Sequence, residues 1–107
     1  MASGILGGVA LPTATATTVY TVPVGKQAAI TVNACNRSST DANSYWLAFT
    51  ANASAASQDF VEFNATIVPT GVLERTGFVL GANVKVIANA SAAGITVMCY
   101  GFEETVS

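Results

Sequence analysis

The sequence predicts an all-β protein: a single-domain β-sandwich or jelly-roll-like fold of seven strands, or eight if an N-terminal segment joins them. Hydrophobic and polar residues alternate with a period of two in most segments after residue 16, as in strands with one buried face. Turn-forming residues separate these segments at intervals of about 8–12 residues, and helical periodicity is absent. These three observations favour two packed sheets over any helical architecture.

Each expected strand is bounded by residues that break or turn the chain. Pro23-Val24-Gly25-Lys26 and Pro69-Thr70-Gly71 carry the proline and glycine of tight turns, and residues 37–43 form a polar loop. The expected strands, in order, are Thr17–Val22, Gln27–Asn36, Ser44–Ala51, Asp59–Val68, Val72–Leu80, Val84–Ala90 and Ile95–Phe102.

Residues 1–18 are expected to form an extended N-terminal arm, and residues 19–107 the sandwich domain. The arm consists mostly of small residues and Thr, which offer little area for a core, yet four side chains are too apolar for a solvated tail: Ile5, Leu6, Val9 and Leu11. We therefore expect these four to form an interface with a neighbouring chain. The alternative is that the part from Ile5 to Leu11 pairs as an edge strand.

Charged residues make up only 9% of the chain, against about 25% in an ordinary domain. Because soluble monomers keep a charged surface, this shortage predicts that partners cover much of the molecule, in a homo-oligomer for which we expect a trimer. A monomer with a neutral Thr and Asn surface is the alternative.

The composition argues against several partners and chemical roles. The net charge is −2 and the four cations are scattered, so no nucleic-acid surface is expected. The apolar run from Gly4 to Leu11 is far shorter than the ~20 residues of a membrane helix, so no membrane is expected either. Cys35 and Cys99 are expected to be buried, reduced and not bonded to each other.

The sequence lacks the residues that most enzymes need. It contains no histidine and no phosphate-binding glycine loop, and its two cysteines cannot complete a structural zinc site. Asp59 and Glu62 should point to opposite faces of their strand, whereas Glu103 and Glu104 should be solvated at a strand end. We therefore expect no catalytic residues, no metal and no cofactor.

Trp46 is an aromatic residue that the alternation places on an outer face, because Tyr45, Leu47 and Phe49 share the other face of its strand. Tryptophan is enriched at interface hot spots, which makes Trp46 a candidate interface residue. Two alternatives are a sugar-binding surface with Tyr45 or Asn43, and packing beneath the loop of residues 37–43.

Four segments together resemble a recurrent small module of tailed-bacteriophage virion proteins. They are Val19–Lys26 (VYTVPVGK), Val32–Arg37 (VNACNR), Val72–Gly77 (VLERTG) and Tyr100–Glu104 (YGFEE). The resemblance covers about residues 19–104, and its specificity lies in the order and spacing of the segments. It implies a small β-sandwich that acts as a capsid decoration (cement) subunit or as part of a tail or fibre.

The sequence therefore predicts a non-enzymatic virion structural protein, assembled in the host cytoplasm, that decorates and stabilises the phage head. Its expected partners are other copies of the same chain and the major capsid protein or tail proteins. A tail, baseplate or fibre-associated subunit is the first alternative, and a carbohydrate-binding module is the second.

Overall fold

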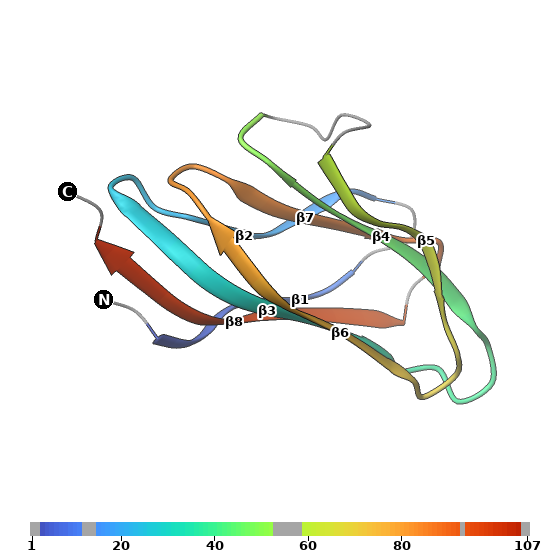
Figure 1. The fold of residues 1–107 in the computed structure, drawn as a ribbon. Coiled ribbons are helices and arrows are strands. Elements are labelled where there is room, and N and C mark those ends of the chain that lie inside the picture. Colours follow the sequence, from blue (N-terminus) through green and yellow to red (C-terminus); the bar gives the residue numbers. More distant parts are fainter. Residues whose placement is uncertain (1–2, 12–14, 53–58, 93, 106–107) are drawn as a thin grey trace.

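The computed structural model describes residues 3–11, 15–52, 59–92 and 94–105, and these residues form an antiparallel β-sandwich (Figure 1). The strands are β1 (Ser3–Ala10), β2 (Thr17–Thr21), β3 (Lys26–Asn36), β4 (Asn43–Thr50), β5 (Phe60–Ile67), β6 (Val72–Leu80), β7 (Lys85–Ala90) and β8 (Ile95–Thr105). The predicted all-β fold is confirmed, and each of the seven strands expected after residue 16 is present with ends shifted by at most three residues.

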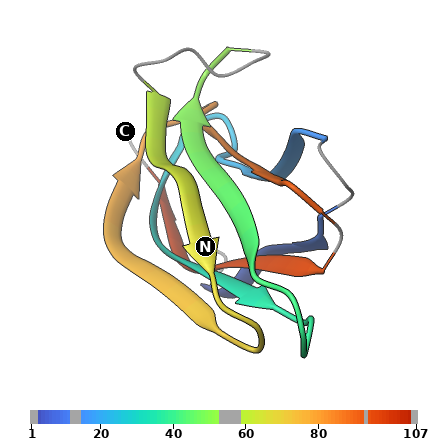
Figure 2. The same cartoon turned by 90° about the vertical axis from the view of Figure 1, so that its right-hand side faces the viewer.

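Two four-stranded sheets face each other (Figure 2). The strand order is β1-β8-β3-β6 in one sheet, here called the β3 sheet, and β2-β7-β4-β5 in the other, the β4 sheet. Strands β1 and β2 therefore lie along one open margin of the sandwich, while β6 and β5 lie along the other. Each sheet presents one outer face that is not covered by the other sheet.

The core forms where the alternating residues of both sheets meet. Strand β3 pairs with β8 over its whole length, from Lys26 opposite Thr105 to Asn36 opposite Ile95. Even-numbered residues of β3 and odd-numbered residues of β8 point inward, as the burial of alternate positions shows. The buried set includes Ala28, Ile30, Val32, Ala34, Tyr45, Leu47, Val86, Ala88, Ile95, Val97 and Cys99.

The N-terminal segment differs from the expected arm. Strand β1 pairs with β8 of the same chain, from Ser3 opposite Phe102 to Ala10 opposite Thr96, and the Leu11 amide donates to the Ile95 carbonyl at 2.8 Å. An arm that stays off its own sandwich is therefore wrong for residues 3–11, and the edge-strand alternative is confirmed. Residues 1, 2 and 12–14 of the expected arm lie outside the described residues.

Close approach explains why β1 can join the sandwich. Gly7 passes so near to β2 that a Cβ atom at this position would clash with the Val19 carbonyl oxygen. The apolar side chains next to it find room in the protein's own core: Leu11 is 2% exposed, and Leu6 and Val9 pack against buried residues. The proposed boundary after residue 18 also falls inside β2, which begins at Thr17.

Candidate functional site

An apolar row crosses the outer face of the β3 sheet. Ala29 on β3 lies opposite Phe102 on β8 and opposite Val79 on β6, so the three residues occupy neighbouring positions on one face. Phe102 is 44% exposed and Val79 is 66% exposed. Ile5, on β1, is 69% exposed and lies opposite Tyr100. Tyr100 precedes Phe102 by two residues on β8, so the two side chains point to the same face. Exposed apolar side chains that are contiguous, unlike scattered ones, indicate a surface for a partner.

The row contains a shallow groove of about 290 Å³. Phe102 and Val79 form its walls because Ala29, the residue between them, has a side chain of only one carbon. Thr31, Thr76 and Gly77 also line the groove. We call this feature the β3 groove. The backbones of β8 and β3 come close together beneath it, since a Cβ atom at Gly101 would clash with the Ala29 carbonyl oxygen.

Polar side chains bound the β3 groove in the strand direction. At one end, Gln27 donates to the carboxylate of Glu104 at 3.4 Å. At the other end, the carboxylate of Glu74 accepts hydrogen bonds from the Tyr100 hydroxyl at 2.6 Å and from the Asn33 amide at 3.5 Å. The hydrogen bond to Glu74, with a smaller contribution from desolvation, raises the pKa of Tyr100 above its ordinary value.

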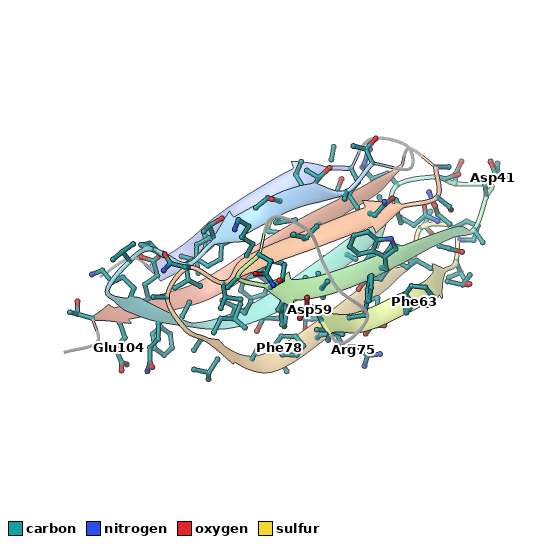
Figure 3. The ribbon with its side chains drawn as sticks, turned by 90° about the horizontal axis from the view of Figure 1, so that it is seen from above. Asp41, Asp59, Phe63, Arg75, Phe78 and Glu104 are labelled. Atoms are coloured by element: carbon teal, nitrogen blue, oxygen red, sulfur yellow. The ribbon has the colours of Figure 1, made fainter. Side chains whose placement is uncertain are left out.

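The outer face of the β4 sheet carries an aromatic cluster made of Trp46, Phe60 and Phe63. The Trp46 and Phe60 rings meet edge to face at 5.0 Å between centroids, and the Phe60 and Phe63 rings do the same at 5.0 Å. Phe63 is 65% exposed and lies on β5, at the margin of its sheet (Figure 3). Edge-to-face geometry at this distance is favourable for aromatic pairs.

Trp46 points outward as predicted, but its expected sugar-binding partners do not join it. Tyr45 is 2% exposed and Asn43 is 5% exposed, because both belong to the inward face of β4. Burial raises the pKa of Tyr45, with a further contribution from the negative charge of Glu62. The structure therefore does not assemble the three residues proposed for a carbohydrate site.

The four N-terminal candidates are divided between the surface and the core. Ile5 is exposed on the outer face of the β3 sheet, whereas Leu6 and Val9 are partly buried and Leu11 is fully buried. Of the five interface residues predicted from the sequence, only Ile5 and Trp46 belong to an outer face. Ala29, Val79 and Phe102 were missed because their proximity depends on the registers of three strands, which one sequence does not reveal.

The carboxylates that were candidates for catalysis occupy three environments. Glu62 is buried and accepts a hydrogen bond from the Arg75 guanidinium across the β5–β6 margin. Glu103 was expected to be solvated, and this is wrong: it is 8% exposed and accepts a hydrogen bond from the Tyr20 hydroxyl of the opposite sheet. Only Glu104 is exposed as expected. Asp59 lies near the start of β5 (Figure 3).

The two cysteines are free thiols, as predicted, and they point to opposite faces of the β3 sheet. Cys99 is fully buried, and desolvation raises its pKa to about 11. Cys35 was also expected in the core, but it lies on the outer face and is only half-buried. The alternation along β3 already puts Cys35 on the same face as the outward residues Thr31 and Asn33, so its position could have been predicted.

Two buried asparagines fix the loops at the end of the sandwich where Asp41 lies, opposite to the end that carries Glu104 (Figure 3). The Asn36 amide donates to the carbonyls of Asp41 at 2.9 Å and Ile67 at 3.0 Å. The Asn43 amide donates to the Ala92 carbonyl at 2.8 Å, and its oxygen accepts from the Ser91 hydroxyl at 2.7 Å. Their polar atoms are satisfied within the chain, so these residues serve the fold.

The described residues contain no group of three or more His, Cys, Asp or Glu side chains placed to hold a metal ion. Within the same residues, no helix is long and apolar enough to cross a membrane. No protein-family model matches the chain, and no curated protein sequence is significantly similar to it.

Proposed function

We propose that this chain is a non-enzymatic structural protein of a tailed-phage virion, and specifically a capsid decoration (cement) protein. The observation that supports the proposal is the combination of a charge-poor sequence with apolar side chains exposed on both outer faces of the sandwich. Phe102, Val79 and Ile5 occupy one face, and Phe63 the other. Monomeric soluble domains rarely leave such surfaces open to water.

The size of the outer faces suits this function. The molecule extends over 48 × 27 × 19 Å, so the rectangle that encloses its broadest side measures about 1,300 Å², and the outer face of a sheet is smaller than this. A stable interface needs roughly 800 Å² on each partner. A decoration protein binds at many equivalent positions of one shell, so a modest interface on each copy is sufficient. One face can therefore bind the shell while a margin or the other face contacts neighbouring copies, as in the expected trimer.

Cryo-electron microscopy of virions from the phage that encodes this chain tests the proposal. We expect density for an eight-stranded sandwich at repeated positions on the head, in contact with the major capsid protein. Density on the tail, baseplate or fibre would replace decoration with the tail-associated alternative. Absence of the chain from purified virions, checked by mass spectrometry, would overturn a virion role altogether.

The self-association part of the proposal has its own test. Sedimentation equilibrium of the purified chain at micromolar concentration should give the mass of a homo-oligomer, for which we expect three copies. A monomer in solution together with isolated, non-touching copies on the particle would contradict it.

A further inference from the structure

We propose that the β3 groove is a socket for one apolar side chain of a partner protein, presented by an extended segment that carries Lys or Arg on both sides of that side chain. The inference deepens the proposed function, on which it rests only in taking the partner to be another virion protein. The shape of the groove, its apolar walls and the charges at its two ends each support one part of the proposal.

The groove has the dimensions of a side-chain pocket. Its volume of about 290 Å³ exceeds the roughly 150 Å³ that is enough to hold a benzene ring. Phe102 and Val79 offer apolar surface on either side of Ala29, and both are exposed when nothing covers them. An inserted Phe or Leu side chain would bury all three surfaces at once, which is the arrangement of an interface anchor.

The two ends of the groove are negatively charged. Glu104, opposite Gln27, lies two positions beyond the Ala29 level in one direction, and Glu74, opposite Asn33, lies two positions beyond Thr31 in the other. The partners of both carboxylates are neutral amides or a hydroxyl, so neither charge is compensated. Among the residues of β1, β3, β6 and β8 that the alternation places on this face, none is Lys or Arg, and the next cation along it is Arg37, which follows the end of β3 four positions beyond Asn33.

The alternation places the nearest strand cations, Lys26 and Arg75, on the opposite face of the sheet from the groove. The Lys26 ammonium donates to the Thr105 hydroxyl at 3.0 Å, and the Arg75 guanidinium binds Glu62 between the sheets. A neutral or acidic partner segment would therefore meet uncompensated carboxylates at both ends of the groove, whereas a basic one would pair with them. Charge complementarity of this kind favours the cationic segment and disfavours the others.

The spacing of the two carboxylates defines the partner segment. Gln27 and Asn33, which mark their levels, are six residues apart on β3, and a strand rises about 3.3 Å per residue, so the charges lie about 20 Å apart. An extended segment over the groove would place cations two residues before and after its apolar anchor, on the same face as the anchor, and Lys and Arg side chains can reach outward from there toward the two carboxylates.

The test is a titration of the full chain, followed by ¹H–¹⁵N NMR, with the synthetic peptide acetyl-Lys-Gly-Phe-Gly-Lys-amide, whose Lys and Phe side chains share one face when it is extended. We expect weak, saturable binding with the largest shifts at the amides of Ala29, Thr31, Thr76 and Phe102. Two control peptides replace both Lys by Gln or the Phe by Ala. Each Lys that pairs with Glu74 or Glu104 should strengthen binding about two- to fivefold, so the Gln peptide should bind less tightly. The Ala peptide lacks the apolar anchor and should not bind.

Variants of the chain make the result specific. Ala29→Leu fills the floor of the groove and should abolish the peptide shifts, while Ala51→Leu, at an exposed position outside the groove, should leave them unchanged. Glu74→Gln with Glu104→Gln should remove the preference for the Lys peptide over the Gln peptide. The double charge variant keeps the test informative even if Ala29→Leu does not fold.

Three results would overturn the socket: no shifts at millimolar peptide, shifts centred outside the groove, or equal affinities for the three peptides. These results differ from failure of the proposed function. Peptide binding by a chain that is absent from virions would retain the socket and reject the virion role. If the Ala29→Leu variant still decorates heads and the chain binds no peptide, the virion role is retained and the socket is rejected.

Discussion

The hydroxyl of Tyr20 on β2 donates a hydrogen bond to the carboxylate of Glu103 on β8, and both side chains are 8% exposed. This bond joins the two sheets near the margin formed by β1 and β2. At the other margin, Arg75 on β6 and Glu62 on β5 join the sheets in the same way. The margins are where a two-layer core meets water, and a polar pair across each one holds the sheets together there.

Tyr20→Phe should lower the free energy of unfolding by about 1–3 kcal/mol, because it leaves the Glu103 carboxylate buried without its donor. Urea unfolding monitored by circular dichroism measures this loss. Tyr100→Phe is the matched control, since it removes a hydroxyl that also donates to a glutamate, Glu74, but at an exposed position. The control should change the stability by less than about 0.5 kcal/mol. Equal losses in the two variants would contradict a structural role for the buried bond.

Stability should fall in alkaline solution, beginning near pH 9. Burial raises the pKa of the Cys99 thiol from 9.0 to about 11, so between these values the unfolded chain loses this proton while the folded chain keeps it. The unfolded state then binds fewer protons, and the free energy of unfolding decreases as pH rises. The pKa values of Tyr20 and Tyr45 are also raised, chiefly by burial, which extends the decrease to higher pH.

Urea unfolding at a series of pH values from 7 to 11 measures this dependence. Cys99→Val removes the thiol while keeping an apolar side chain in the core, and it should make the decrease between pH 9 and 11 shallower. An unchanged slope in Cys99→Val would show that the thiol does not contribute.

The strands were predictable because alternation is a local property that each segment carries by itself. The inward set of β3 and the outward position of Trp46 follow directly from the period of two. The same reasoning could have found the burial of Glu103, which shares its parity with the core residues Val97 and Cys99. The predicted strand ended at Phe102, one residue too early to include it.

Strand β1 was harder to predict, since its sequence hides the alternation. Ile5 and Leu6 are consecutive apolar residues, and a register shift between Ile5 and Gly7 interrupts the pairing with β8. The β3 groove was beyond sequence reasoning for a different reason. It requires Phe102, Ala29 and Val79 to lie side by side, and strand order and register are set by the packing of the whole sandwich.

Asn36→Ala should lower the free energy of unfolding by about 2–3 kcal/mol. The amide of Asn36 is fully buried and donates to the Asp41 carbonyl in the loop after β3 and to the Ile67 carbonyl at the end of β5, so its removal leaves these acceptors without a donor. Asn33→Ala is the control, because Asn33 makes one long hydrogen bond at the surface of the same strand. Chemical unfolding of both variants should separate them clearly, and similar stabilities would contradict the loop-fixing role of Asn36.

Gly7→Ala should destabilise the protein by about 1–3 kcal/mol, whereas Gly8→Ala should be neutral or slightly stabilising. A Cβ atom at Gly7 would clash with the backbone of Val19 on β2, and backbone atoms cannot yield without separating β1 from β2. A Cβ atom at Gly8 would make only ordinary van der Waals contacts, with the Met98 side chain at 3.8 Å and the Val97 carbonyl oxygen at 3.9 Å. Replacing glycine in a strand otherwise restricts the unfolded chain, which favours the folded state. Urea unfolding gives the two stabilities, and amide exchange of Val97 and Cys99 reports whether β1 still covers β8. If β1 instead left its own sandwich as an arm, the two variants would behave alike.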